Sequence, residues 1–152
     1  MIDSIDIYRA LSDLLKANFT IGVETKDIKN PQPPCFYIKP VSDSFSQTAT
    51  NYGTTAYSYS IIYFSGAETL EDLLTVKELL KKVIQKKPLR VISYDDNECI
   101  NDLEINSLDF NLDEDDYILT AILNLDLTQR LEVESDDDVE IMENMELNIN
   151  SI

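Results

Sequence analysis

Alternating apolar residues between positions 54 and 64 form the clearest pattern in the chain. In the run TTAYSYSIIYF, one alternating set of side chains is Tyr57, Tyr59, Ile61 and Tyr63. A period of two residues is that of one face of a β-strand. The opposite face of this run also contains apolar residues, so the pattern predicts a strand at the centre of a sheet.

A helix is predicted directly after this strand. Thr69 with Asp72 three residues later resembles a capping box in which Asp replaces the usual Glu or Gln. The apolar residues of the helix are Leu70, Leu73, Leu74, Leu80, Val83 and Ile84, and Val76 and Leu79 widen their face. A face of this width suits a helix that covers a sheet. Pro88 stops the helix, and residues 89–93 then predict a short strand before a turn at 94–97.

The chain opens with another amphipathic helix, predicted over residues 2–19. Asp3 or Ser4 is its expected N-cap. Its apolar stripe consists of Ile5, Tyr8, Leu11, Leu14, Leu15 and Ala17. Because such a stripe must dock on an apolar surface, we expect this helix to flank the sheet.

Shorter elements are predicted between the opening helix and the central strand. Residues 20–24 can form a short strand, and the proline-rich residues 26–34 indicate an extended connection. A further strand is predicted from Cys35 to Lys39, ended by Pro40. The polar, small residues at 42–55 fit either a surface loop or a hairpin arm that orders against a partner.

Two runs of alternation late in the chain predict a pair of strands. In residues 103–112 the apolar side changes face near Ser107, which predicts a bulge or bend. In residues 117–127 one face consists of Leu119, Ala121, Leu123, Leu125 and Leu127. Residues 113–116 join the two runs as a hairpin turn. The predicted fold is therefore α+β, a largely antiparallel sheet of about four to six strands flanked by two main helices.

The acidic residues are concentrated in the C-terminal part of the chain. We expect residues 1–131 to form a single domain and residues 132–152 an acidic C-terminal tail. The formal net charge is −17. Residues 1–94 carry a net charge of +1 and residues 95–152 a net charge of −18. This distribution argues against ordinary DNA or RNA binding, which depends on Lys and Arg neutralising phosphates.

The composition also bears on location and redox state. The chain has no apolar run long enough for an ordinary transmembrane helix, and its first residues lack the features of a signal peptide. We therefore expect a protein made and kept in the cytoplasm. In that compartment Cys35 and Cys99 are expected to be free, packed thiols.

Two segments hold apolar residues that they cannot bury by themselves. One is the polar stretch around Phe45 and Tyr52, and the other is the acidic tail. The tail fits either disorder in isolation or a strand added to the sheet edge of a neighbouring subunit. We expect subunit contacts at Phe45, Tyr52, Val139, Ile141, Met145, Leu147 and Ile149.

The sequence offers little material for catalysis. It contains no histidine, which removes the commonest general base and metal ligand. Its three glycines cannot build a phosphate-binding loop of either common kind. The carboxylate clusters at 95–96, 113–116 and 136–138 lack the spacing of a calcium-binding loop, so they are interpreted as solvated turns. We predict no catalytic, cofactor-binding or metal-binding residues and no cofactor.

Taken in order, these elements resemble the phage tail terminator family of phages and phage-derived particles of Gram-positive bacteria such as clostridia. The similarity lies in the opening IDIYRALSDLLKANF helix, the proline-rich lead into CFYIKP, and the YSYSIIYFSG strand followed by ETLEDLLTVKELLKKVI. It continues in the late pair DLEINSLDFNL and DYILTAILNLDL. The resemblance covers about residues 1–130, in order, spacing and composition rather than in a short motif.

The resemblance implies a structural protein of the virion and not an enzyme. Such subunits assemble as a ring, usually a hexamer, on the head-proximal end of the tail. The ring stops polymerisation of the tail tube, and of the sheath in a contractile tail, and presents a surface to the head–tail connector. The implied location is the host cytoplasm during assembly and then the phage or tail-like particle. DNA would pass through the ring without specific binding, and no membrane is involved.

Two other classes of function compete with this interpretation. An acidic adaptor or inhibitor that mimics nucleic acid would use the same negative charge to occupy a basic groove on a partner. A metal-dependent hydrolase would use the carboxylate clusters, although their spacing does not favour it.

Overall fold

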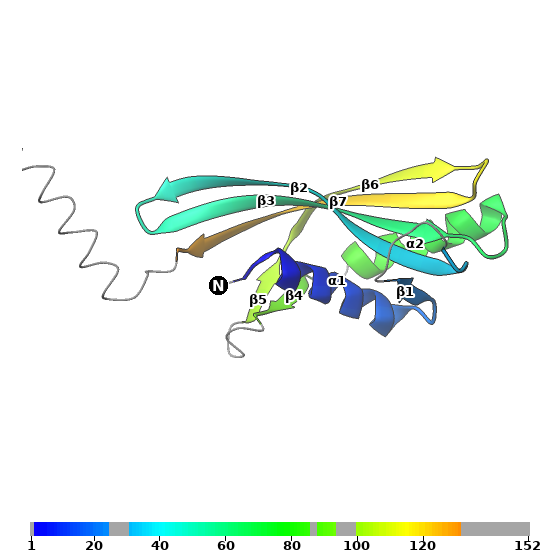
Figure 1. Ribbon diagram of the computed structural model, residues 1–152, viewed down its shortest axis with the longest axis horizontal. Coiled ribbons are helices and arrows are strands. Elements are labelled where there is room, and N and C mark those ends of the chain that lie inside the picture. Colours follow the sequence, from blue (N-terminus) through cyan, green and yellow to red (C-terminus); the bar gives the residue numbers. More distant parts are fainter. Residues whose placement is uncertain (1, 25–30, 86–87, 94–99, 132–152) are drawn as a thin grey trace, which may run out of the picture.

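The computed structural model describes residues 2–24, 31–85, 88–93 and 100–131. Two helices lie on one face of a long, twisted five-stranded sheet (Figure 1). The turn predicted at 94–97, Cys99, the acidic tail and most of the connection at 26–34 lie outside these residues. Neither described helix is long and apolar enough to cross a membrane.

The sheet is mixed but mainly antiparallel. The helices are α1 (Ser4–Asn18) and α2 (Leu70–Gln85). The five strands, in their order across the sheet, are β1 (Gly22–Glu24), β2 (Cys35–Ala49), β3 (Tyr52–Phe64), β7 (Ile118–Arg130) and β6 (Ile105–Asp113). Only β1 and β2 pair in parallel. A separate two-stranded sheet consists of β4 (Leu89–Ile92) and β5 (Ile100–Leu103). The predicted α+β fold is confirmed.

Strand β3 lies at the centre of the sheet, as its two partly apolar faces predicted. The side chains of Tyr59 and Ile61 are buried on the face that carries the helices. Strand β7 is its antiparallel neighbour, with Tyr59 opposite Leu123 and Ile61 opposite Ala121. The predicted inward face of β7 is buried along its whole length, from Leu119 to Leu127. These two strands form the floor of the core.

Helix α1 begins where the capping pattern predicted. The Asp3 carboxylate accepts hydrogen bonds from the backbone N–H groups of Ile5 and Asp6, each at 3.0 Å, and the Asp6 carboxylate accepts one from the Asp3 N–H. The buried face of the helix is rotated from the predicted stripe, because Ile7 is fully buried while Ile5 is 58% exposed.

Two anchors fix the rotation of α1. The Tyr59 hydroxyl donates to the Ser4 carbonyl at 3.0 Å. The Gln129 side chain accepts from the Ile2 N–H at 3.0 Å and donates to the Ile2 carbonyl at 2.8 Å. The predicted stripe was therefore wrong at Ile5 and also at Ala17, which is exposed.

Helix α2 buries only part of its apolar surface. The buried residues are Leu73, Val76, Leu80 and Ile84. The remaining leucines of the predicted face are exposed by 40–44%, namely Leu70, Leu74 and Leu79. The predicted single wide face was wrong. The helix packs against β6 and β7 near one end of the sheet, so one stripe is covered. Leu70 and Leu74 form a second stripe outside it, and Leu79 lies on the other side of the covered stripe.

Strand β2 is much longer than predicted, because Pro40 does not end it. The register of β2 against β3 shifts between Pro40 and Ser42, and a bulge of this kind is one of the few places in a sheet that accept proline. Strand β1 pairs only with residues 35–37 of β2. Pro40 therefore lies on an edge strand, where the missing N–H costs the sheet little.

The late strands form as predicted, except that the first of them is divided into two strands. Glu104 separates β5 from β6, so the run that begins at Leu103 serves two sheets. The predicted bulge lies at Ile105 and Ser107, where the register against β7 shifts. In the predicted turn, the Asp113 carboxylate accepts from the N–H groups of Asp115 and Asp116 at 3.1 and 3.2 Å.

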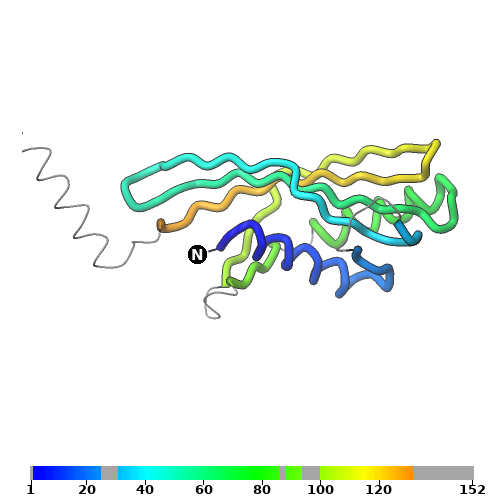
Figure 2. The backbone as a smooth tube through the Cα atoms, in the orientation of Figure 1, coloured from blue at the N-terminus to red at the C-terminus, as the bar shows by residue number. Residues whose placement is uncertain are grey.

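The polar stretch at 42–55 is a hairpin arm rather than a loop. The distal halves of β2 and β3, with the end of β7, project beyond α1 (Figure 2). The Thr54 and Thr128 hydroxyl groups are 2.7 Å apart across β3 and β7. The Leu131 N–H donates to the Asn51 carbonyl at 2.7 Å, which holds the end of β7 at the hairpin tip.

Candidate assembly interface

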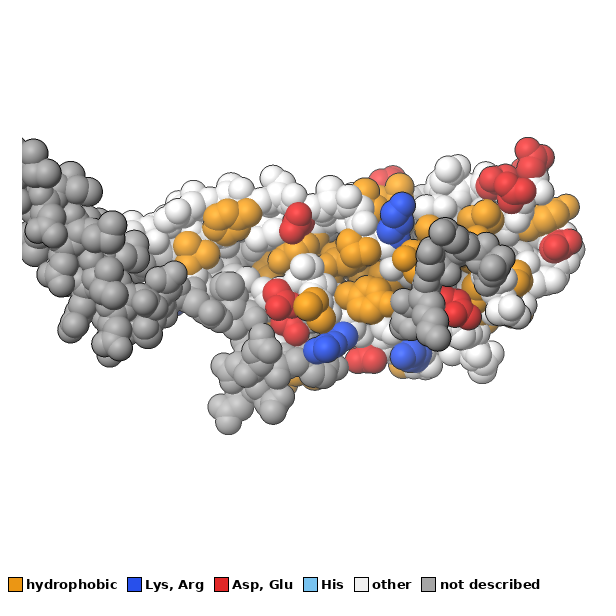
Figure 3. All heavy atoms as spheres, in the orientation of Figure 1, with side chains coloured by type: hydrophobic (Ala, Val, Ile, Leu, Met, Phe, Trp, Pro, Cys, Tyr) orange, Lys and Arg blue, Asp and Glu red, His pale blue; other side chains and the backbone are white. Residues whose placement is uncertain are grey.

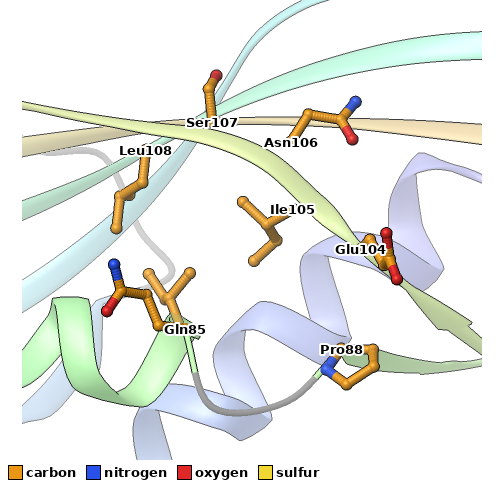
Figure 4. A pocket seen from close by; sticks show the side chains of 8 residues that line it. Gln85, Pro88, Glu104, Ile105, Asn106, Ser107 and Leu108 are labelled. Carbon is orange, nitrogen blue, oxygen red and sulfur yellow. The ribbon is translucent and has the colours of Figure 1, made fainter.

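A hollow lies between the C-terminal end of α2 and the start of β6 (Figure 4). Ile105 and Leu108 point into it, whereas Asn106 and Ser107 point to the other side of the strand. The bulge places both apolar side chains on the same side. Within the described ranges, no group of three His, Cys, Asp or Glu side chains could hold a metal ion.

The described cysteine is a packed thiol, as predicted. Cys35 is buried at the start of β2. Burial, with a smaller contribution from the Glu24 carboxylate, raises the pKa of its thiol above the ordinary value. A raised pKa keeps the thiol protonated and unreactive at neutral pH.

A buried polar cluster joins the end of β3 to the start of α2. Asp72 accepts hydrogen bonds from the Tyr63 hydroxyl at 2.8 Å and the Ser65 hydroxyl at 2.6 Å. Ser65 also accepts from the Glu68 N–H at 3.0 Å, and its own N–H donates to the Tyr117 carbonyl at 3.1 Å. Burial, and then the hydrogen bond to Asp72, raises the pKa of Tyr63. These groups are satisfied by one another, so we assign the cluster to structure.

The hairpin arm carries the two predicted contact residues that the structure describes. Phe45 on β2 is 58% exposed, and Tyr52, the first residue of β3, is 48% exposed. The Phe45 ring lies over Gly53, where a Cβ atom would overlap it. Val41 on the same strand is 52% exposed. Hydrophobic side chains are visible along the arm in the space-filling view (Figure 3). The other predicted contacts, at 139–149, lie outside the described residues.

The outer stripe of α2, formed by Leu70 and Leu74, is a candidate contact surface that the sequence interpretation missed. Both line a shallow hollow on the outer side of the helix, and the charged residues Glu71, Glu78 and Lys82 separate them from Leu79 at its other edge. A signal was present in the sequence: the helix has eight apolar positions on a predicted single face, more than one sheet-facing stripe needs. Two neighbouring exposed leucines make this stripe a candidate interaction surface.

The arm and the outer stripe of α2 lie at opposite ends of an elongated molecule (Figure 1). The two surfaces also differ in structure, since one consists of strands and the other belongs to a helix. A contact between different surfaces of two copies is heterologous, and it produces a ring when the rotation closes and a filament when it does not.

The sheet face turned away from the helices carries charged residues among its apolar and polar side chains. Pairing places Asp109 opposite Ile122 and Asp126 opposite Ala56, on the face opposite to the buried tyrosines. Lys39 lies on the same face, opposite Ser60. Both helices lie on the other face (Figure 1). This face is therefore available to line a passage or to meet a partner.

Comparison with known proteins identifies the family of this chain. The family model of phage tail terminator proteins matches residues 6–141. No curated protein matches the chain. One solved structure, named only by a sequence identifier, is 13% identical with a TM-score of 0.39, over 89% of this chain and 100% of the other; at that level the similarity carries no argument. The family match spans most of the sequence, and the chain belongs to the phage tail terminator family, whose members are structural components of phage tail assembly.

Proposed function

We propose that this protein is the subunit of a ring that caps the head-proximal end of a phage tail. The observation that carries the proposal is the family match over residues 6–141. The ring would stop growth of the tail tube, and of a sheath where one is present, and would join the tail to the head–tail connector. Six copies is the number that the family resemblance implies.

The two apolar surfaces support a ring. The arm with Phe45 and Tyr52 and the outer stripe of α2 lie at opposite ends and are exposed in the single subunit. Repeated contact of one end with the other gives every copy the same environment. A two-fold dimer would instead bring the same surface of each copy together. The predicted contacts at Val139, Ile141, Met145, Leu147 and Ile149 would add to this contact from the tail.

The charge distribution supports a passage for DNA that does not bind it. Residues 95–152 carry a net charge of −18, and two of their acids, Asp109 and Asp126, lie on the sheet face without helices. If that face lines the ring, repulsion between carboxylates and phosphates keeps passing DNA from adhering. A ring structure with basic residues in the lumen and most acids on the outer rim would exclude this arrangement.

The test is the mass of the purified full chain in solution, measured by light scattering, with negative-stain images of the same peak. We expect a ring of six copies, or a monomer that forms rings when tail tubes are added. A monomer that ignores tail tubes would contradict the proposal.

The excess of acid supports a second candidate, an adaptor or inhibitor that mimics nucleic acid. It requires a monomer that binds one basic protein tightly at low salt and loses it as salt rises. The same light-scattering experiment separates the two candidates, since the mimic stays monomeric with tail tubes. Calorimetry with Mg²⁺, Mn²⁺ and Ca²⁺ tests the metal-dependent hydrolase, for which millimolar binding would be required.

A further inference from the structure

The five-stranded sheet has two outer edges with free backbone groups. On one side, β1 covers only residues 35–37 of β2, and among the described residues nothing pairs with the outer edge of β2 beyond them. On the other side, β6 pairs only with β7 within the described part of the chain. Such edges accept an added strand from another chain.

Charge distinguishes the two edges for an acidic strand. Strand β6 carries Asp109 and Asp113 and runs into an acidic turn that ends at Asp116. Over residues 38–49, β2 carries one base, Lys39, and one acid, Asp43. An acidic strand is repelled at β6 and meets no net charge at β2.

The C-terminal segment has the pattern of an added strand. From position 139 to 149 the odd positions are Val139, Ile141, Glu143, Met145, Leu147 and Ile149. The even positions are polar except for Met142. This alternation gives one apolar and one polar face. A strand of this kind beside β2 could turn its apolar face toward Phe45, which is more than half exposed on the helix-bearing side of the sheet.

We propose that residues 139–149 of one copy add as a strand to the outer edge of β2, over residues 41–49, in a second copy. The inference rests on the proposed assembly of copies and names the surface that receives the tail. Pro40 sets one limit of the receiving edge, because it has no N–H to donate.

The course of the chain favours a second copy over the same copy. The Leu131 N–H bonds to the Asn51 carbonyl at the hairpin tip, so the chain leaves the arm while still running away from its own body. Residues 132–138 include five acids and no glycine or proline. Mutual repulsion opposes folding such a segment back on itself, and seven residues, if extended, span roughly 23 Å, which is enough to reach another copy.

Disulfide trapping between two full-length variants tests the proposal. Every chain carries Cys99→Ser, while the buried Cys35 is retained. One variant has Ser44→Cys, an exposed position on β2, and the other has Asn144→Cys in the tail. Because the register is free, Met142→Cys and Glu146→Cys are tested as well. The matched control replaces Ser44→Cys with Asn111→Cys, an exposed position on β6.

The variants are mixed, assembled alone or on tail tubes, oxidised and run on a denaturing gel without reductant. We expect a dimer band for Ser44→Cys with at least one tail variant, at several times the yield obtained with Asn111→Cys. A band that favours Asn111→Cys, or no band in a sample that has formed rings, overturns the inference and leaves the proposed function standing.

A chain with both Ser44→Cys and Asn144→Cys shows whether the tail binds the β2 of its own copy or of another copy. If it closes only an internal disulfide, the tail binds its own β2 and the proposal is wrong. Dimer bands in a sample without rings would keep strand addition and contradict the ring. A sample with no dimer band and no rings would contradict both the strand addition and the ring.

Discussion

Two buried tyrosines of β3 make hydrogen bonds through their hydroxyl groups inside the fold. Tyr59 and Tyr63 are 1% and 2% exposed, and each donates a hydrogen bond. Burial is the largest cause that raises the pKa of both, and the nearby Tyr57 adds to the effect at Tyr59. The folded state therefore holds these protons at a pH where the unfolded chain loses them.

We expect stability to fall as the pH rises above about 10, the ordinary pKa of tyrosine. A raised folded pKa means that the unfolded state releases its protons first, so the free energy of unfolding falls as the pH rises. Urea unfolding at pH 8, 10 and 11 measures this. Tyr59→Phe should make the decline shallower, and an equal decline in that variant would contradict the assignment.

Replacement of Asp72 tests the cluster at the start of α2. Asp72→Ala leaves the buried Tyr63 and Ser65 hydroxyls without their acceptor, and the expected loss is about 1–3 kcal/mol of unfolding free energy. The matched control is Glu78→Ala, an exposed acid on the same helix. Equal effects of the two changes in urea unfolding would show that the cluster contributes nothing specific.

At the scale of elements, strict alternation and helix capping predicted the structure better than the positions of prolines did. The periods at β3 and β7 gave the correct buried faces, and Asp3 gave the start of α1. Pro40 misled, because the sequence alone does not show that β2 is an edge strand with a bulge.

Partly buried surfaces were harder to predict. The exposed stripe of α2 could not be separated from its buried stripe, since that depends on where the helix ends relative to the sheet. For the candidate interface, composition pointed to Phe45 and Tyr52 but not to Leu74. Strand pairing between distant segments decides these outcomes, and local patterns do not contain it.

The two stripes of α2 should respond differently to substitution. The Leu74 side chain is 40% exposed in the subunit. Leu74→Glu should therefore change the free energy of unfolding by no more than about 0.5 kcal/mol, while reducing ring formation. Leu73→Ala, in the buried stripe, should cost about 2–5 kcal/mol. Light scattering and urea unfolding of both variants check this. Full ring formation by Leu74→Glu would remove the outer stripe from the interface.

At the scale of the molecule, the arm is separate from the helix-covered core. The core lies where both helices cover the sheet, and the arm extends beyond it (Figure 1). Because the arm buries little within one subunit, we propose that its order and its function depend on neighbouring copies.

Truncation after Leu131 tests the division between domain and tail. We expect the shortened chain to keep the circular dichroism and unfolding midpoint of the full chain, because the described core ends by that residue. Its assembly should weaken by at least tenfold in protein concentration, measured by light scattering. Unchanged ring formation would show that the tail does not link subunits.

The placement of different contact surfaces at the two ends has a genetic consequence. A copy damaged only at its arm, for example by Phe45→Glu, still offers an intact α2 stripe to a neighbour. In the proposed ring it would enter during growth and block the next addition, so a single such copy would spoil the assembly. Damage of this kind should be dominant when the mutant and the normal gene are expressed together, whereas a chain that fails to fold should be recessive.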